Sequence, residues 1–262
     1  MTDLDGTLLD RDTYSYEESL PAIETAKEEG IPIVFCSSKT RAEQEALRSE
    51  LGIDDPFIVE DGAALYVPSD YFGFDYEYGI FSDGYRVSEF AVPYSEVRKA
   101  LSAVGSETGV EFRGYGDLSV KELADITGLD PEAAERAKLR EYQETIVSEI
   151  ESGKVETVEQ ALNKRGLKMT SGGRFFGVTS SKGKGEAAGV LIGLFKEQHP
   201  EVKTVGIGDG QNDVSLLSVV DFPFLVRKPG GRWEDMEISG LTRVPGVGPD
   251  GWRRAVFDLL KE

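Results

Sequence analysis

Two carboxylates near the start of the chain are spaced so that both can act on one ligand. Asp3 and Asp5 are separated by one residue, and alternate side chains of extended backbone point the same way. Gly6 permits a tight exit from such a segment, and Thr7 adds a hydroxyl group. The same residues could form an ordinary acidic turn. They do not start an EF-hand calcium loop, because Leu8 stands where that loop needs glycine.

A second group of oxygen-bearing side chains follows an apolar segment late in the chain. Residues 206–213 read Gly-Ile-Gly-Asp-Gly-Gln-Asn-Asp, which brings Asp209, Asn212 and Asp213 within five positions. Hard oxygen ligands of this kind suit Mg²⁺, which favours carboxylates, water and substrate phosphate. The glycines lack the third member of a dinucleotide-binding fingerprint. The alternative is a glycine-rich turn in which Asp213 caps the following helix.

Lysines and glycines alternate at the start of a predicted helix. Residues 180–185 read Ser-Ser-Lys-Gly-Lys-Gly, so backbone N–H groups and the charge of Lys182 could receive a phosphate group. Surface lysines beside glycines are common, so this segment alone is weak evidence for a site.

The composition excludes several classes of protein. The 262 residues hold 29 Lys+Arg against 48 Asp+Glu, a net charge of −19, which argues against a nucleic-acid or anionic-membrane partner. Cys36 and His199 are the only cysteine and histidine, so an intrachain disulfide, a Cys/His zinc site and a histidine-dependent triad are excluded. No apolar stretch is long enough to span a membrane and the start is polar, so we expect a cytoplasmic protein.

The two ends of the chain carry the pattern of an α/β fold. A helical spacing over residues 20–26 precedes residues 31–36, which are apolar almost throughout, as in a strand covered on both faces. Similar helix and strand patterns resume over residues 188–195 and 203–207. We therefore predict a three-layer Rossmann-like core with a mostly parallel sheet. In such sheets ligands bind where the strands end, which is where the acidic clusters stand.

The middle of the chain has a different character. Residues 86–92 alternate polar and apolar side chains with period two, which indicates a sheet with one solvated face. Helix and strand patterns then alternate up to about residue 178. We predict an inserted α+β cap over residues 84–178, with the core formed by residues 1–83 and 179–262, and the cap placed to act as a lid.

Taken together, the clusters resemble the four ordered motifs of the haloacid dehalogenase phosphatase superfamily. The motifs are matched by Asp-x-Asp-Gly-Thr at the start, Ser37 after the second strand, Lys182 at a helix start and Gly-Asp-x-x-Asn-Asp late in the chain. Residues 60–62, Glu-Asp-Gly, are similar to the Glu-Asn-Gly turn of the subgroup that carries its cap between the second and third motifs. Asp61 departs from the usual asparagine there.

This resemblance implies a catalytic mechanism. Asp3 would attack phosphorus and become an aspartyl phosphate, while Asp5 would protonate the leaving oxygen and later deprotonate water. Ser37 and Lys182 would hold the phosphoryl oxygens, with Lys182 counted among the catalytic residues. Mg²⁺ would be the cofactor, and the residues implied for holding it are Asp3, the backbone carbonyl of Asp5, Asp209 and Asp213, supported by Asn212.

Three further segments are similar to the mannosyl-3-phosphoglycerate phosphatase family, namely residues 37–41, 140–144 and 172–176, as is the ending 246–252. The resemblance implies hydrolysis of a phosphorylated sugar-glycerate to mannosylglycerate, a compatible solute. Lys39 and Arg174 could neutralise a carboxylate plus phosphate, and Glu141 or Gln143 could accept sugar hydroxyls. The substrate-binding residues expected are Thr7, Ser37, Ser38, Lys39, Glu141, Gln143, Arg174 and Asn212.

Several of these residues could have a purely structural role. Arg174 could form an ion pair on the cap surface, and Glu141 could simply end a helix. Trp252 is expected in the core and not stacked on a ligand. The functional alternatives are a glucosyl-3-phosphoglycerate or broader sugar-phosphate phosphatase, a phosphohexomutase, or an inactive phosphosugar-binding protein. The protein could be a monomer or a homodimer.

The segment before Asp3 departs from the resembled family. In that family an apolar strand of several residues leads into the nucleophile, whereas only Met1 and Thr2 precede Asp3 here. Such a strand would be central and buried on both faces, so its loss should be severely destabilising. We therefore expect the natural chain to begin some residues upstream.

Overall fold

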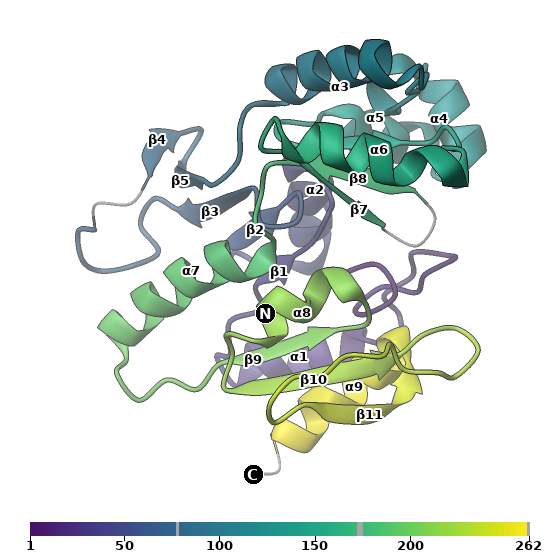
Figure 1. Ribbon diagram of the computed structural model, residues 1–262. Coiled ribbons are helices and arrows are strands. Elements are labelled where there is room, and N and C mark those ends of the chain that lie inside the picture. The colour runs from purple at the N-terminus through teal and green to yellow at the C-terminus, as the bar shows by residue number, and fades with distance from the viewer. Residues whose placement is uncertain (77–78, 172–174, 261–262) are drawn as a thin grey trace.

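The computed structural model describes residues 1–76, 79–171 and 175–260. Figure 1 shows two tiers, a lower core that contains both ends of the chain and an upper cap inserted between β5 and α7. The fold is the expected α/β core with a mostly parallel sheet and an inserted α+β cap. None of the described helices is long and apolar enough to cross a membrane.

The core sheet consists of two halves that meet at the first residues of the chain. One half has the order β1-β2-β3-β5-β4 and the other β11-β10-β9. Thr2 forms parallel bridges to Phe35 on one side and Ile207 on the other. The N–H of Asp3 donates to the carbonyl of Ile207 at 2.9 Å. Asp3 therefore lies between the two halves, at the edge where the parallel strands end. The strands are β1 (Phe35–Cys36), β2 (Phe57–Val59), β3 (Ala64–Pro68), β4 (Ile80–Ser82), β5 (Tyr85–Glu89), β9 (Val205–Gly208), β10 (Phe222–Arg227) and β11 (Thr242–Val247).

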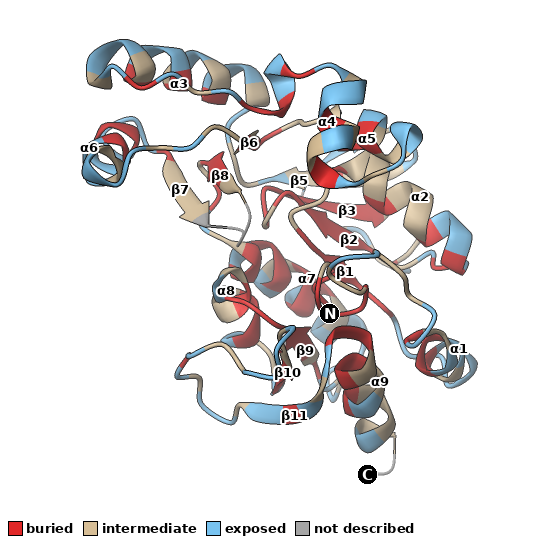
Figure 2. Cartoon of the chain, turned by 90° about the vertical axis from the view of Figure 1, so that its right-hand side faces the viewer, coloured by how far each residue is buried: buried red, intermediate tan, exposed pale blue. Residues whose placement is uncertain are grey.

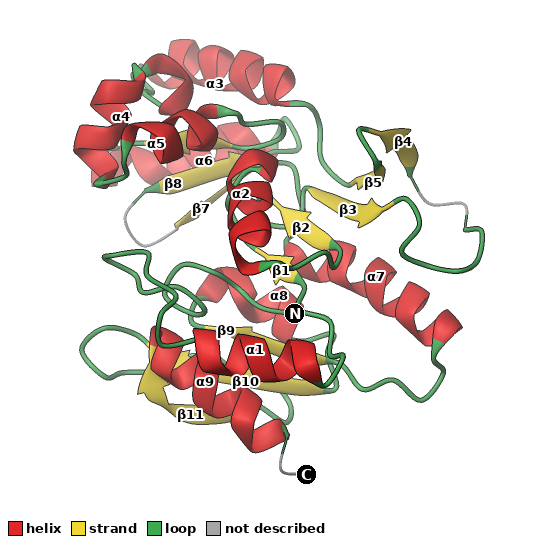
Figure 3. Ribbon diagram, turned by 180° about the vertical axis from the view of Figure 1, so that it is seen from behind, coloured by secondary structure: helices red, strands yellow, loops and turns green. Residues whose placement is uncertain are grey.

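Helices cover both faces of this sheet, which makes three layers. Figure 3 shows α1, α2 and α9 in front of the strands, and Figure 1 shows α7 and α8 on the opposite side. Successive strand residues serve opposite faces: Phe57 packs with α1 and α9, whereas Ile58 packs with α7 and α8. Figure 2 shows buried residues along β1, β2 and β3, whereas β11 is mostly exposed. The helices are α1 (Leu20–Glu28), α2 (Arg41–Leu51), α7 (Lys184–Gln198), α8 (Val214–Leu217) and α9 (Gly248–Leu259).

Trp252 on α9 is a core residue, as predicted. Its side chain is 2% exposed, and its indole N–H donates to the hydroxyl oxygen of Thr2 at 2.9 Å. The Thr2 hydroxyl in turn donates to the carbonyl of Asp3 at 2.7 Å. This chain of bonds ties α9 to the segment that carries the first acidic cluster.

The cap is a small sheet covered by helices on one face. Its strands have the order β6-β8-β7, all antiparallel. Ile146 and Val178 face α3 and α6, whereas Thr145 and Gly177, their neighbours along the strands, line a cavity on the other face. The cap sheet therefore presents its uncovered face to the core. Its elements are α3 (Tyr94–Thr108), η1 (Tyr115–Asp117), α4 (Val120–Thr127), α5 (Pro131–Lys138), β6 (Glu144–Ile146), α6 (Ser152–Asn163), β7 (Lys168–Ser171) and β8 (Phe176–Thr179).

The first boundary of the cap differs from the expected one. β5 pairs antiparallel with β3 and with β4, so it extends the core sheet. The alternation over residues 86–92 thus marks the antiparallel margin of the core sheet and not a new domain. The insert begins after Glu89, so the boundary predicted at residue 84 was too early.

Candidate active site

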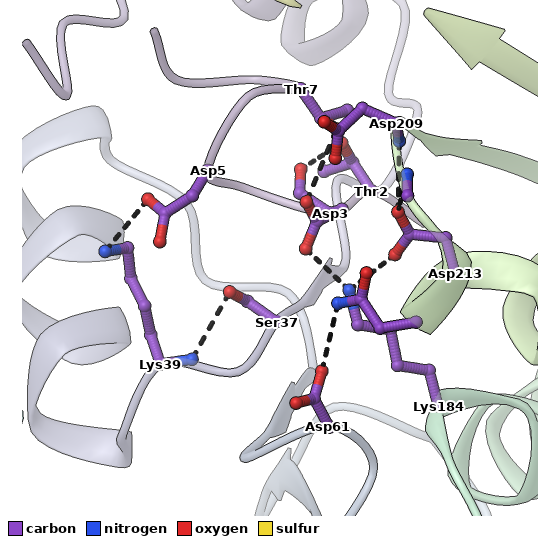
Figure 4. Close-up of polar contacts among 12 residues, drawn as sticks. Thr2, Asp3, Asp5, Thr7, Ser37, Lys39, Asp61, Lys184, Asp209 and Asp213 are labelled. Atoms are coloured by element: carbon purple, nitrogen blue, oxygen red, sulfur yellow. Dashed lines mark hydrogen bonds and ion pairs between the residues drawn. The ribbon is translucent and has the colours of Figure 1, made fainter. Parts of the chain in front are cut away.

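A buried lysine joins the two acidic clusters. Nζ of Lys184 lies 2.5 Å from Oδ1 of Asp3 and 2.6 Å from Oδ1 of Asp213. Figure 4 shows the three side chains converging from separate elements. Lys184 and Asp213 are fully buried, and Asp3 nearly so. The clusters that lie about two hundred residues apart in the chain therefore form one charged network.

Helical geometry places Lys184, and not Lys182, in this network. Lys184 is the first residue of α7 and shares its buried face with Ala188 and Leu191. Lys182 lies before the helix, with a side chain that is 79% exposed and paired with Glu186 at 3.0 Å. The structure therefore places Lys184, two positions further along, where Lys182 was predicted to lie. The spacing 184, 188 and 191 is the sequence signal that could have identified the buried lysine.

The network has a strongly perturbed protonation equilibrium. Burial alone would lower the pKa of Lys184, but Asp213 and Asp3 outweigh it and raise that pKa well above its ordinary value. Burial raises the pKa of Asp3, the charge of Asp213 adds to this, and Lys184 opposes it. Three buried carboxylates, those of Asp3, Asp209 and Asp213, thus face one buried ammonium group.

The loop after β9 aims Asp213 into the site. Oδ2 of Asp213 accepts the backbone N–H groups of Asp209 and Gly210, both at 3.0 Å. A Cβ atom on Gly208 would lie 2.6 Å from this carboxylate, so glycine is needed for the close approach. The turn continues as η2 (Gln211–Asp213) into α8.

Asp3, Asp209 and Asp213 form a donor set that fits a divalent cation. They place one oxygen each within 4.8 Å of one another. Burial and the charge of Asp213 raise the pKa of Asp209 to about 7, although Arg11 lies 3.4 Å from Oδ2 of Asp209. The three carboxylates carry more negative charge than the neighbouring cations neutralise. They also offer only oxygen ligands, which Mg²⁺ prefers.

Asp5 points away from Asp3 toward α2. Its Oδ1 lies 3.0 Å from Nζ of Lys39, which is also 3.7 Å from Oε1 of Glu43 and 4.9 Å from the ring centre of Tyr14. Burial would lower the pKa of Lys39, but Asp5 and Glu43 raise it. Lys39 therefore has carboxylate partners within the protein and is not a free cation.

Most of the predicted residues surround one cavity of about 670 Å³ between core and cap, its wall including Asp3, Asp5, Ser38, Lys39, Gln143, Asp209 and Asn212. Thr7 is buried beside it, with its hydroxyl 3.4 Å from Oδ2 of Asp3. Ser37 is also buried, and its Oγ accepts the N–H of Lys39 at 3.3 Å.

Two substrate-binding predictions have a different outcome. The carboxylate of Glu141 accepts the hydroxyl of Tyr66 at 3.0 Å, and Glu141 is not among the described residues that line the cavity. Its role is to contact the core sheet, a tertiary contact that its sequence neighbours do not reveal. Arg174 lies outside the described residues.

Sequence reasoning missed the residues that join cap and core. The buried carboxylate of Glu60 accepts three successive backbone N–H groups, those of Glu141 at 2.8 Å, Tyr142 at 3.0 Å and Gln143 at 2.6 Å. Burial raises the pKa of Glu60 to about 7, partly offset by Arg140. Arg140 itself donates to the carbonyl of Ser38 at 2.8 Å. The acidic turn at residues 60–62 was the available signal.

Comparison with known proteins places this geometry in context. Residues 1–75 match the haloacid dehalogenase-like hydrolase family. The chain is 39% identical over 260 residues to a glucosyl-3-phosphoglycerate/mannosyl-3-phosphoglycerate phosphatase of Methanococcoides burtonii, covering 99% of this chain and 96% of that one. It is 42% identical over 224 residues to a mannosyl-3-phosphoglycerate phosphatase of Pyrococcus furiosus, covering 86% and 88%.

Solved structures share the fold. A Thermoplasma acidophilum protein superposes with a TM-score of 0.68 at 17% identity, covering 100% of this chain and 97% of that chain. A sugar phosphatase of haloacid dehalogenase subclass IIB superposes with a TM-score of 0.62 at 20% identity, covering 98% and 97%. At such low identity the likeness concerns the fold alone.

Proposed function

Because the chain belongs to the haloacid dehalogenase superfamily and is a phosphatase, we propose that it hydrolyses mannosyl-3-phosphoglycerate to mannosylglycerate and phosphate with the aid of Mg²⁺. The observation that carries the chemistry is the buried contact of Asp3 with Lys184 at the floor of a cavity covered by the cap. The choice of substrate rests on the activities that the relatives' names state.

Asp3 is the nucleophile in this proposal. Its carboxylate oxygen forms a bond to phosphorus as the ester bond to the leaving alcohol breaks, and Asp5 gives that alcohol a proton. Asp5 then takes a proton from a water molecule that attacks the aspartyl phosphate. This second step releases inorganic phosphate and restores Asp3.

Lys184 takes the part that the resemblance assigns to the lysine of the third motif. Its ammonium group opposes protonation of Asp3 and holds the carboxylate in one orientation. Asp213 fixes Lys184 from the other side. A divalent cation would be held by Asp3, the backbone carbonyl of Asp5 and Asp209, with Asp213 beside them, and would supply Lewis-acid stabilisation of the phosphoryl oxygens.

The remaining predicted residues would bind the substrate. Thr7 lies beside Asp3, and Ser38 and Asn212 line the same cavity; together with Ser37 they would donate to phosphoryl oxygens. Lys39 and Arg174 are proposed to neutralise the glycerate carboxylate, although the contact of Lys39 with Asp5 makes it equally suited to orient Asp5. Gln143 would bind the sugar.

Glucosyl-3-phosphoglycerate is a second candidate substrate, because the Methanococcoides burtonii relative is named for both sugars. The two substrates differ at one sugar carbon, so both fit the same arrangement of charge.

The test is release of inorganic phosphate from mannosyl-3-phosphoglycerate, glucosyl-3-phosphoglycerate and hexose phosphates, each with Mg²⁺ and with EDTA. We expect a preference of ~100-fold for a glycosyl-phosphoglycerate, equivalent to about 2.7 kcal/mol of transition-state binding, and no turnover with EDTA. Equal rates on all esters would refute the substrate. Full activity in EDTA would refute the metal requirement, and metal-dependent binding without turnover would favour a binding protein.

A further inference from the structure

The turn at residues 60–62 has an unusual backbone. Glu60, Asp61 and Gly62 have φ values of 47°, 57° and 87°, so three successive residues lie in the left-handed region. For a residue other than glycine this conformation is strained, and it persists only where surrounding contacts impose it. A Cβ atom on Gly62 would lie 2.4 Å from the carbonyl oxygen of Gly183, so the turn packs directly against the start of α7.

The two carboxylates of this turn both accept hydrogen bonds from residues 141–143 of the cap. Glu60 holds its backbone, as described above. Oδ2 of Asp61 accepts the side-chain amide of Gln143 at 3.3 Å, and Oδ1 of Asp61 accepts the amide of Asn212 at 3.3 Å. The turn therefore fixes both the main chain and the side chain of Gln143.

The carboxylate of Asp61 decides which way the Gln143 amide faces. An ionised carboxylate only accepts hydrogen bonds, so Gln143 must present its NH₂ group to Asp61. The backbone of Asp61 is itself fixed, because its N–H donates to the carbonyl of Ser37 at 3.0 Å and its carbonyl accepts the hydroxyl of Ser181 at 2.9 Å. Asp61 is thus a rigid acceptor.

This leaves the carbonyl oxygen of Gln143 without a partner. Gln143 is 3% exposed, and its Oε1 is buried with no hydrogen-bond partner among the described residues. Its amide lies over Gly177 of β8, where a Cβ atom would be 2.0 Å from Nε2, so only glycine leaves room for it. An unsatisfied buried acceptor is unfavourable and rare, and Gln143 lies in the wall of the cavity that Asp3 also lines.

We propose that Asp61 is a positioning residue that holds Gln143 as an obligatory acceptor for a hydroxyl group in the alcohol half of the phosphate ester. The inference rests on the proposed function. It adds that Asp61 and Gln143 together make the enzyme prefer phosphate esters whose alcohol half carries hydroxyl groups. Asp61 replaces the asparagine of the resembled turn. An asparagine at this position has its own NH₂ group, which would satisfy Oε1 of Gln143 if the amide turned round.

The test compares mannosyl-3-phosphoglycerate with p-nitrophenyl phosphate, whose alcohol half carries no hydroxyl group. Gln143→Met keeps the size of the side chain and removes its amide, and we expect ~30-fold lower kcat/KM for the sugar ester with less than ~2-fold change for the aryl ester. Asp61→Asn should lower the same ratio ~5-fold. Gln160→Met on the exposed face of α6 and the surface variant Asp54→Asn are matched controls and should leave both rates unchanged.

A double variant tests whether Asp61 acts through Gln143. If it does, Asp61→Asn adds no further loss of selectivity in the Gln143→Met background. Additive losses, equal losses on both esters or no loss at all would overturn the inference. Wild-type enzyme that hydrolyses both esters equally would instead defeat the proposed substrate, and the same variants would then be compared on glucose 6-phosphate and p-nitrophenyl phosphate, with the same outcomes deciding the inference.

Discussion

The two ends of the cavity are built in contrasting ways. At the core end, Asp3, Lys184 and Asp213 are buried charges fixed by strand ends and a helix start. At the cap end, the wall has neutral groups such as Gln143 and Thr145 beside a single charged residue among those described, Arg140. The core end is therefore complete within one domain, whereas the cap end exists only while the cap contacts the core. The two ends of the cavity are thus held in place by different kinds of contact.

The contacts between the domains are mainly side chain to backbone. Glu60 accepts three cap N–H groups, Arg140 donates to the carbonyl of Ser38, and the hydroxyl of Thr40 donates to the carbonyl of Arg136 at 2.9 Å. Backbone groups at this interface do not depend on which side chains line the cap. The arrangement allows the cap wall to differ between substrates while the docking of the cap is kept.

Replacement of the proposed nucleophile is the sharpest test of the core end. Asp3→Asn should reduce kcat at least ~10³-fold on every ester, because an amide cannot replace the carboxylate that attacks phosphorus in the proposed mechanism. Steady-state phosphate release measures it, with the exposed variant Asp70→Asn as control. Turnover above a few per cent of wild type would contradict the assignment of Asp3.

The two neighbouring lysines offer a matched pair. Lys184→Met leaves the carboxylates of Asp3 and Asp213 without their buried cation, so we expect ~10²-fold lower kcat and a loss of stability of about 3–5 kcal/mol. Lys182→Met removes an exposed charge and should change kcat less than ~2-fold. Turnover and urea unfolding measure both. A larger loss of kcat in Lys182→Met than in Lys184→Met would support the catalytic role predicted for Lys182.

Glu60 tests the domain contact separately from the cap wall. Glu60→Gln keeps the shape but turns an NH₂ group toward backbone donors, which should weaken cap docking by about 1–3 kcal/mol. The kcat/KM should fall about equally for the sugar ester and for p-nitrophenyl phosphate, unlike the selective loss expected for Gln143→Met. A loss of kcat/KM confined to the sugar ester would mean that the contact between cap and core also determines substrate preference.

The pH dependence of stability tests Glu60 without a change in the active site. The pKa of Glu60 is about 7 in the folded protein and about 4.5 when exposed, so the folded state binds the extra proton between these values. Stability should therefore fall as pH rises from about 4.5 to 7, by up to about 3 kcal/mol from this group. Urea unfolding at pH 5 and pH 7.5 measures the slope, which should be shallower in Glu60→Gln. Identical slopes would show that Glu60 does not contribute.

The sequence allowed the core end to be predicted better than the cap end. Buried strands are recognisable from their apolar runs, and acidic residues at strand ends led directly to Asp3, Asp209 and Asp213. Lys184 was missed because two lysines among glycines look alike until the helix start is known. The contact of Glu141 with Tyr66 and the pairing of β5 with β3 depend on residues far along the chain, which local patterns do not encode.

The hydrogen bond from Trp252 to Thr2 has a practical consequence for spectroscopy. The indole is buried two bonded groups away from Asp3, whereas Trp233, the other tryptophan, stacks on Arg227 and is only half-buried. Intrinsic fluorescence from Trp252 should be blue-shifted and sensitive to the charge on Asp3. A Trp233→Phe variant would leave a single tryptophan near Asp3, so that formation and breakdown of the proposed aspartyl phosphate could be followed without a label.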